Sequence, residues 1–109
     1  MFKDKLVINF RKDTVGLGYE KELSRVRVKF SLTSFNGMVY AGIDCVAHDD
    51  HGVKIESVNV TVSALAGYGL EMLVKRCFAS AEKCVANVDL LDIVVEAEFY
   101  VLEKLEGEF

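Results

Sequence analysis

RVRVKFSLTSFNGMVYAGIDCVA, residues 25–47, is the stretch that decides the fold of this chain. Its first half alternates apolar and polar residues, which is the pattern of a half-buried β-strand. Asn36 and Gly37 follow, and Asn-Gly between two strand-like runs favours a two-residue hairpin turn because both residues accept a positive φ angle. The sequence therefore predicts an antiparallel hairpin with Phe35 opposite Met38.

The register that follows from this turn places apolar residues opposite one another on the inward face of the hairpin. The expected pairs are Thr33 with Tyr40, Leu32 with Ala41, Phe30 with Ile43, Lys29 with Asp44, Val28 with Cys45 and Val26 with Ala47. On the outward face Lys29 and Asp44 carry opposite charges, and such a cross-strand pair is worth about 0.2–1 kcal/mol. Turn chemistry and side-chain pattern agree, which strengthens the prediction.

The stretch CVAHDDHG, residues 45–52, contains both histidines of the chain and one of its three cysteines. A structural zinc site needs typically four nitrogen or sulfur ligands, and no second His or Cys pair with suitable spacing occurs elsewhere. A Cys45–His48 nucleophile pair would lack a third group to orient it. The stretch is therefore interpreted as a turn after a strand that ends at Ala47, with metal capture by His48 and His51 as the alternative.

Three further strands are predicted. One covers residues 5–10, and another begins at Val53, with a bulge near Glu56 or Ser57 that reconciles two phases of apolar alternation. The last covers residues 91–104, in which apolar residues again occupy every second position.

Glu96 and Glu98 would share one face of that last strand. Two carboxylates in this arrangement can serve as general acid and base, but nothing in the sequence indicates a pocket around them. A solvated strand face is the favoured interpretation. We also expect these acids to lie across from the basic residues of the central hairpin.

One long helix is predicted within residues 63–87, because apolar residues recur there at intervals of three and four. Its start lies at Ser63 or near Gly69, since glycine inside a helix costs about 1 kcal/mol relative to alanine. Cys77 and Cys84 would share its core face. Seven residues separate them, too far for a disulfide within one helix.

The predicted fold is a single α+β domain over residues 1–109. It has a mainly antiparallel sheet of about five strands, with one long helix packed on one face, in the order ββββαβ. The conformation of residues 11–24 stays open.

Charge is unevenly distributed along the chain, whose formal net charge is −4. Residues 1–30 carry eight basic and four acidic residues, and the remainder carries five basic and thirteen acidic residues. This asymmetry indicates either a basic ligand site or two ends that neutralise each other in the fold. The expected position of the last strand favours the second interpretation.

No motif in the sequence indicates a cofactor or a membrane segment. Gly67-Tyr68-Gly69 precedes a helix but lacks the lysine and the spacing of phosphate-binding loops. The N-terminal residues do not have the pattern of a signal peptide or an anchor. The odd number of cysteines, three, favours reduced thiols over a framework of disulfides. We therefore expect a cytoplasmic protein without cofactor or metal.

Three classes of function remain, and catalysis is not favoured among them. The first is an acidic protein-binding module, either a homo-oligomer or an inhibitor or adaptor of another protein, that uses an apolar patch on the open sheet face. Six residues make up this expected patch: Phe35, Met38, Tyr40, Val46, Tyr100 and Leu102.

The second class is a nucleic-acid binder, less favoured because the net charge is negative. It would use the basic stripe Arg25, Arg27 and Lys29, with Phe35 and Tyr40 as stacking platforms. An acidic protein partner would fit the same stripe.

The third class is a small enzyme or ligand carrier. Its pocket would lie between helix and sheet, around Tyr68, Cys77, His48 and Glu96.

Overall fold

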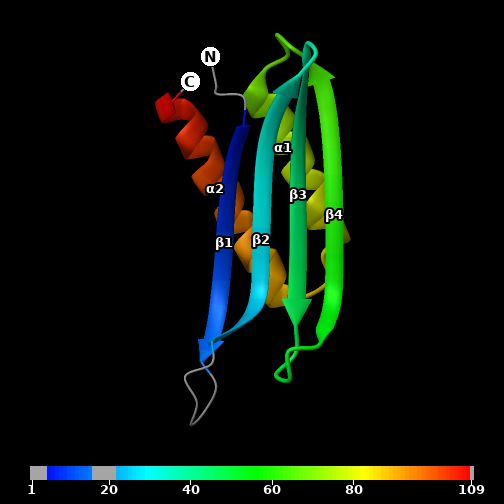
Figure 1. Cartoon of the computed structure of the whole chain (residues 1–109), viewed down its shortest axis with the longest axis vertical. Helices are drawn as coiled ribbons and strands as arrows, with labels where there is room; N and C mark the ends of the chain where they lie inside the picture. The colour runs from blue at the N-terminus through cyan, green and yellow to red at the C-terminus, as the bar shows by residue number, and fades with distance from the viewer. Residues whose placement is uncertain (1–4, 16–21, 109) are drawn as a thin grey trace.

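The computed structural model describes residues 5–15 and 22–108 and places them in two layers. A four-stranded antiparallel sheet with strand order β1-β2-β3-β4 forms one layer, and two helices pack together on one side of it (Figure 1). The elements are β1 (Lys5–Val15), β2 (Glu22–Phe35), β3 (Met38–His48), β4 (Lys54–Leu65), α1 (Leu70–Cys84) and α2 (Val88–Glu108). The α+β class and the antiparallel sheet are confirmed.

The central hairpin confirms the predicted turn and register. Asn36 and Gly37 have φ angles of 51° and 76°, as the two-residue turn requires. Every predicted pair between β2 and β3 is present. Lys29 and Asp44 lie opposite each other, but among the described side chains they form no ion pair.

The turn after β3 also follows the prediction, with the strand extending one residue further, to His48. Asp49 organises it: its carboxylate accepts hydrogen bonds from the backbone N–H groups of His51 and Val53, both at 2.9 Å. The register of β3 with β4 then shifts, which leaves Ile55 as the extra residue of a bulge. The sequence placed this bulge one or two residues later, near Glu56 or Ser57.

The predicted strand over residues 91–104 is wrong, because this segment belongs to α2. Its buried residues recur at helical intervals of three and four: Leu90, Ile93, Val94, Ala97, Val101 and Leu105. Ile93, Ala97 and Val101, each four residues apart, satisfy both a strand and a helix period. Helix wins because its length of 21 residues is far above that of a usual strand and its Glu, Ala and Leu content favours helix.

The hydrophobic core lies between the sheet and both helices. α2 packs mainly on β1 and β2, and α1 packs on β3 and β4. Phe30 of β2 and Phe78 of α1 stack with ring centroids 5.2 Å apart, and both side chains are fully buried. Cys45 and Cys77 are buried here as expected, and burial raises the pKa of each thiol to about 12. Cys84, by contrast, is exposed.

A carboxylate from the sheet holds the linker between the helices. Glu56 of β4 accepts hydrogen bonds from the backbone N–H groups of Ala86 and Asn87, at 2.8 and 2.9 Å. Asn87 in turn caps α2, because its Oδ1 accepts a hydrogen bond from the N–H of Leu90 at 2.9 Å. Glu56 thus ties the start of α2 to the sheet.

Strands β1 and β4 are the two edges of the sheet. At the edge of β4 the guanidinium of Arg76, from α1, donates a hydrogen bond to the backbone carbonyl of Ser63 at 2.9 Å. The same guanidinium lies 5.8 Å from the centroid of the Tyr68 ring. Of residues 11–24, which the sequence left open, residues 11–15 and 22–24 extend β1 and β2, and residues 16–21 lie outside the described chain.

Candidate functional site: the uncovered face of the sheet

One face of the sheet carries no covering element of the described chain. Figure 1 shows this face toward the viewer, with both helices behind the strands. Its middle is built from small and polar side chains, which leave it flat: Ser31, Gly42, Asn59, Thr61 and Ser63. Larger side chains gather at two other places on this face.

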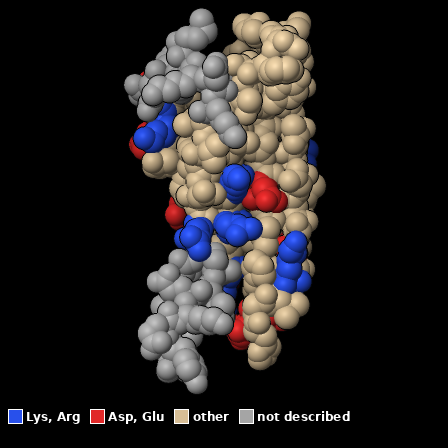
Figure 2. All heavy atoms as spheres, viewed as in Figure 1, with Lys and Arg blue, Asp and Glu red and all other residues tan. Residues whose placement is uncertain are grey.

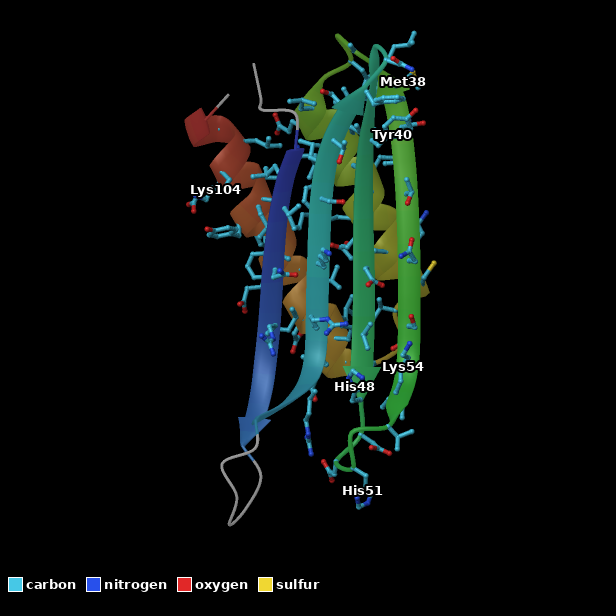
Figure 3. The ribbon with its side chains drawn as sticks, viewed as in Figure 1. Met38, Tyr40, His48, His51, Lys54 and Lys104 are labelled. Atoms are coloured by element: carbon cyan, nitrogen blue, oxygen red, sulfur yellow. The ribbon has the colours of Figure 1, made fainter. Side chains whose placement is uncertain are left out.

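The first place is an apolar end, defined as Phe35, Met38, Tyr40 and Leu65. Phe35 lies opposite Met38, and Met38 lies opposite Leu65, so the three form one row across β2, β3 and β4. Phe35 and Leu65 are 64% and 71% exposed, and Tyr40, in the next row, is 37% exposed. Figure 3 shows Met38 and Tyr40 at the hairpin end of the sheet. Three exposed apolar side chains therefore surround the half-buried Met38 at this end of the face.

The six residues of the expected patch do not form one surface. Phe35, Met38 and Tyr40 come together, but Val46 is only 4% exposed. Tyr100 and Leu102 lie on α2, in the other layer.

Tyr100 packs edge-on against Phe10 of β1, with centroids 5.1 Å apart. Leu65 was not among the expected residues. The sequence feature that could have indicated its exposure is its position at the end of an alternating strand, directly after two small residues.

The second place is a basic cluster, defined as Arg11, Arg27 and Lys29. Arg11 of β1 lies directly opposite Arg27 of β2, and Lys29 follows on the same face. With Asn9 and Asp44 these residues line a shallow hollow of about 440 Å³. Figure 2 shows Lys and Arg side chains gathered midway along this face, next to an acidic one.

Arg25, the third member of the predicted basic stripe, does not belong to this cluster, because its charge is paired. Its guanidinium forms an ion pair with Asp50 of the turn after β3. Arg27 and Lys29 form no ion pair with any described residue. Of the stripe, Arg27 and Lys29 are therefore the two cations without an ion pair to the described part of the chain.

A second hollow of about 240 Å³ adjoins the first, since Lys29 and Asp44 line both. Its other lining residues include Ser31, Gly42 and Thr61. A Cβ atom on Gly42 would lie 3.5 Å from Ser31 Oγ, so the glycine keeps this floor low. The hydroxyl groups of Ser31 and Thr61 and the amide of Asn59 thus lie next to the basic cluster on the same face of the sheet.

Charges separate between the two layers. The described helices carry these acids: Glu71, Glu82, Asp89, Asp92, Glu96, Glu98, Glu103, Glu106 and Glu108. Their bases are fewer: Lys75, Arg76, Lys83 and Lys104. The expectation that the acidic segment lies beside the basic residues of β2 is wrong, because that segment is a helix behind the sheet and the neighbours of β2 are β1 and β3. Arg11 marks the border, since it also lines a hollow with Asp92 and Glu96.

Glu96 and Glu98 do not form the expected pair on one face. Glu98 lies close to Glu82 of α1, whose carboxylate affects its pKa. Burial raises the pKa of Glu98 to about 7, and the negative charge of Glu82 adds to the increase, whereas Lys75 opposes it. Below this pKa a protonated Glu98 can donate to the Glu82 carboxylate and join the two helices.

Glu98→Gln should remove a pH dependence of stability. The pKa of Glu98 is about 7 in the folded chain against a usual 4.5, so between these values the folded state binds more protons than the unfolded state. The free energy of unfolding therefore falls as pH rises through this window, and the variant should lose that fall. Urea titrations followed by circular dichroism at several pH values from 5 to 8 measure it.

Glu96→Gln is the matched control, because it removes an exposed carboxylate of α2 and keeps Glu98. This control should retain the fall seen in the native chain. A native chain whose stability does not decrease between these pH values would contradict the assignment.

The residues considered for metal binding and for a pocket lie apart. Figure 3 shows His48 and His51 at the turn end of the sheet, far from the apolar end. No group of three or more His, Cys, Asp or Glu side chains suited to a metal ion occurs among the described residues. Tyr68 is exposed, Cys77 is buried in the core, and Glu96 is exposed on α2, so these residues and His48 do not surround one cavity.

Comparisons with protein-family models, with curated proteins and with solved structures find no match to this chain. Neither helix, as far as the structure describes it, is long and apolar enough to cross a membrane.

Proposed function

We propose that this chain is a non-enzymatic protein-binding module that acts through the uncovered face of its sheet. The observation that supports it most is the apolar end, where Phe35, Tyr40 and Leu65 are exposed around the half-buried Met38. Aromatic residues and Met are enriched at protein interfaces, and a contiguous exposed apolar patch is rare on the surface of a monomer. The face is flat between the apolar end and the basic cluster, and a flat surface is better suited to binding a protein than to enclosing a small molecule.

The partner on this face is a different protein, and this chain acts as its inhibitor or as an adaptor that binds it. Two copies stacked face to face would place the basic cluster against itself or against the apolar end of the other copy. The first arrangement brings like charges together, and the second buries charge against apolar groups without a partner. Both oppose a symmetric homo-oligomer through this surface. The proposal includes the cytoplasmic location expected from the sequence.

Nucleic-acid binding is the second candidate, and the basic cluster favours it. Phosphate contacts use Arg and Lys side chains, and Arg27 and Lys29 are available for them. Single-strand binders also place aromatic side chains beside such cations. Tyr40 lies four residues along β3 from Asp44, about 13 Å away at strand spacing, so it does not stack above the cluster. Protein binding is therefore favoured.

The double variant Phe35→Asp/Leu65→Asp should abolish partner binding and leave the fold intact. Both side chains are exposed, so the change costs the fold little and places two charges in the proposed interface. The measurement is quantitative affinity capture from extract of the native host, with the captured proteins compared between native and variant chains.

Phe99→Asp is the matched control, because Phe99 is 72% exposed on α2 and lies outside the uncovered face. A protein retained by the native chain and by this control, but lost by the double variant, supports the proposal. Equal retention by all three chains would place the interface elsewhere. Circular dichroism melts of each chain verify that the fold is kept.

A further inference from the structure

We infer that the basic cluster binds carboxylate groups, so that the partner presents an acidic segment to the uncovered face. This inference rests on the protein-binding function proposed above and names the chemistry of the partner. It is carried by the juxtaposition of Arg27 and Lys29 with Arg11 around one hollow.

The arrangement of like charges is the first argument. Arg11 and Arg27 are direct cross-strand partners, and side chains at such positions start about 5 Å apart. Like charges directly opposite each other destabilise a sheet. Arg27 and Lys29 gain no compensating ion pair from any described residue. An anion placed beside Arg27 and Lys29 would supply the missing opposite charge, and bidentate Arg–carboxylate contacts are among the stronger hydrogen bonds of proteins.

The lining of the two hollows is the second argument. Beside the cations it holds hydrogen-bonding side chains that can meet the polar groups of a peptide: Asn9, Ser31, Asn59 and Thr61. No aromatic side chain lines either hollow, in the part of the chain that the structure describes, so bases would find no stacking platform. Asp44 lines both hollows, and its charge disfavours a densely charged phosphate chain more than separate carboxylates. An acidic peptide fits this lining better than a polynucleotide.

The position of the apolar end is the third argument. Lys29 and Phe35 lie on the same strand, six residues apart, which is about 20 Å at strand spacing. An extended peptide of about seven residues can therefore reach from the basic cluster to the apolar end. The partner segment should carry acidic residues at one end and an apolar anchor at the other.

The test uses a fluorescein-labelled synthetic peptide of about 12 residues, with glutamates near one end and a leucine about six residues further on. Fluorescence anisotropy measures its affinity for the full chain between about 20 and about 150 mM NaCl. We expect binding that weakens with salt and is lost by about tenfold or more in Arg27→Glu/Lys29→Glu. Asp44→Asn should strengthen binding about threefold, because it removes the one described negative charge of the hollow.

Lys83→Glu/Lys104→Glu is the matched control, since both lysines are exposed on the helices and the net charge changes equally. It should alter the affinity by less than about twofold. A loss equal to that of Arg27→Glu/Lys29→Glu would show that only net charge matters and would overturn the inference. Tighter binding of a single-stranded oligonucleotide than of the peptide would overturn it as well, and so would no peptide binding at the lowest salt.

Failure of this inference and failure of the proposed function give different results in the capture experiment. If Arg27→Glu/Lys29→Glu keeps the captured protein and Phe35→Asp/Leu65→Asp loses it, the uncovered face binds protein without the basic cluster. If Phe35→Asp/Leu65→Asp keeps the protein, the proposed function itself is wrong. Loss in both variants, with retention in the Lys83→Glu/Lys104→Glu control, supports both.

Discussion

Phe30→Ala is expected to lower the free energy of unfolding by about 3–5 kcal/mol, a large fraction of the stability of a domain of this size. Phe30 is fully buried and stacks on Phe78, so the change removes contacts to both layers at once. The cavity that remains lies between β2 and α1, where backbone atoms on both sides limit collapse. The chain has no Trp, so circular dichroism during urea titration is the suitable measurement.

Phe35→Ala provides the matched control for this prediction. It is the same substitution on the same strand, five residues later, at a side chain that is mostly exposed. Its effect on the free energy of unfolding should stay within about 0.5 kcal/mol. Equal losses in the two variants would mean that the assignment of inward and outward faces of β2 is wrong.

Glu56→Gln is expected to lower the free energy of unfolding by about 2 kcal/mol. The two carboxylate oxygens of Glu56 accept hydrogen bonds from Ala86 and Asn87. A glutamine offers one acceptor oxygen and turns its NH₂ group toward a second N–H donor, so one bond is lost and a donor is left without a partner. The start of α2 should then open more readily. Hydrogen exchange of the backbone amides of residues 86–90 measures this local effect beside the global unfolding curve.

Glu71→Gln is the matched control for Glu56→Gln. Glu71 forms an ion pair with Lys75 one helical turn later, at 3.1 Å, with both side chains largely exposed. Exposed pairs of this kind contribute about 0.5 kcal/mol or less. If the free energy of unfolding falls equally in both variants, the contact between Glu56 and the linker stabilises the fold no more than an exposed ion pair does.

The hairpin shows what the sequence could predict. Asn36-Gly37 specifies one turn geometry, and the alternation before it specifies one face, so two local signals define all pairs between β2 and β3. Strand β4 and helix α1 followed from the same kind of local periodicity. The α+β class needed only these elements.

The last element shows what the sequence could not predict. Residues 93–101 contain apolar side chains at both strand and helix intervals, so periodicity alone leaves the choice open. The choice is made by the core, because a helix buries Leu90, Val94, Ala97 and Val101 along one line against the sheet. That contact is tertiary, and no local pattern contains it.

The same error moved the candidate site. With residues 91–104 as a strand, Tyr100 and Leu102 joined the apolar patch and the acids neutralised the basic stripe. As a helix, the segment carries its acids behind the sheet and leaves the basic residues of β1 and β2 together. The proposed function keeps Phe35, Met38 and Tyr40 of the expected patch, adds Leu65, and retains the acidic partner that the sequence allowed for the basic stripe.

The contact between Arg76 and Ser63 has a consequence for solubility. Ala66 donates its N–H to Gly37 at 2.8 Å, so by alternation along β4 the backbone groups of Ser57, Asn59, Thr61 and Ser63 point away from the sheet. From Ser57 to Leu65 this edge strand carries no charged residue, so it is a template onto which another strand can add, as in aggregation.

Arg76 interrupts that template at Ser63, because a strand arriving there would have to displace a guanidinium from its carbonyl. A helix residue that contributes little to the core thus acts as a gatekeeper for the sheet. The contribution of Arg76 is therefore to oppose the addition of further strands to β4.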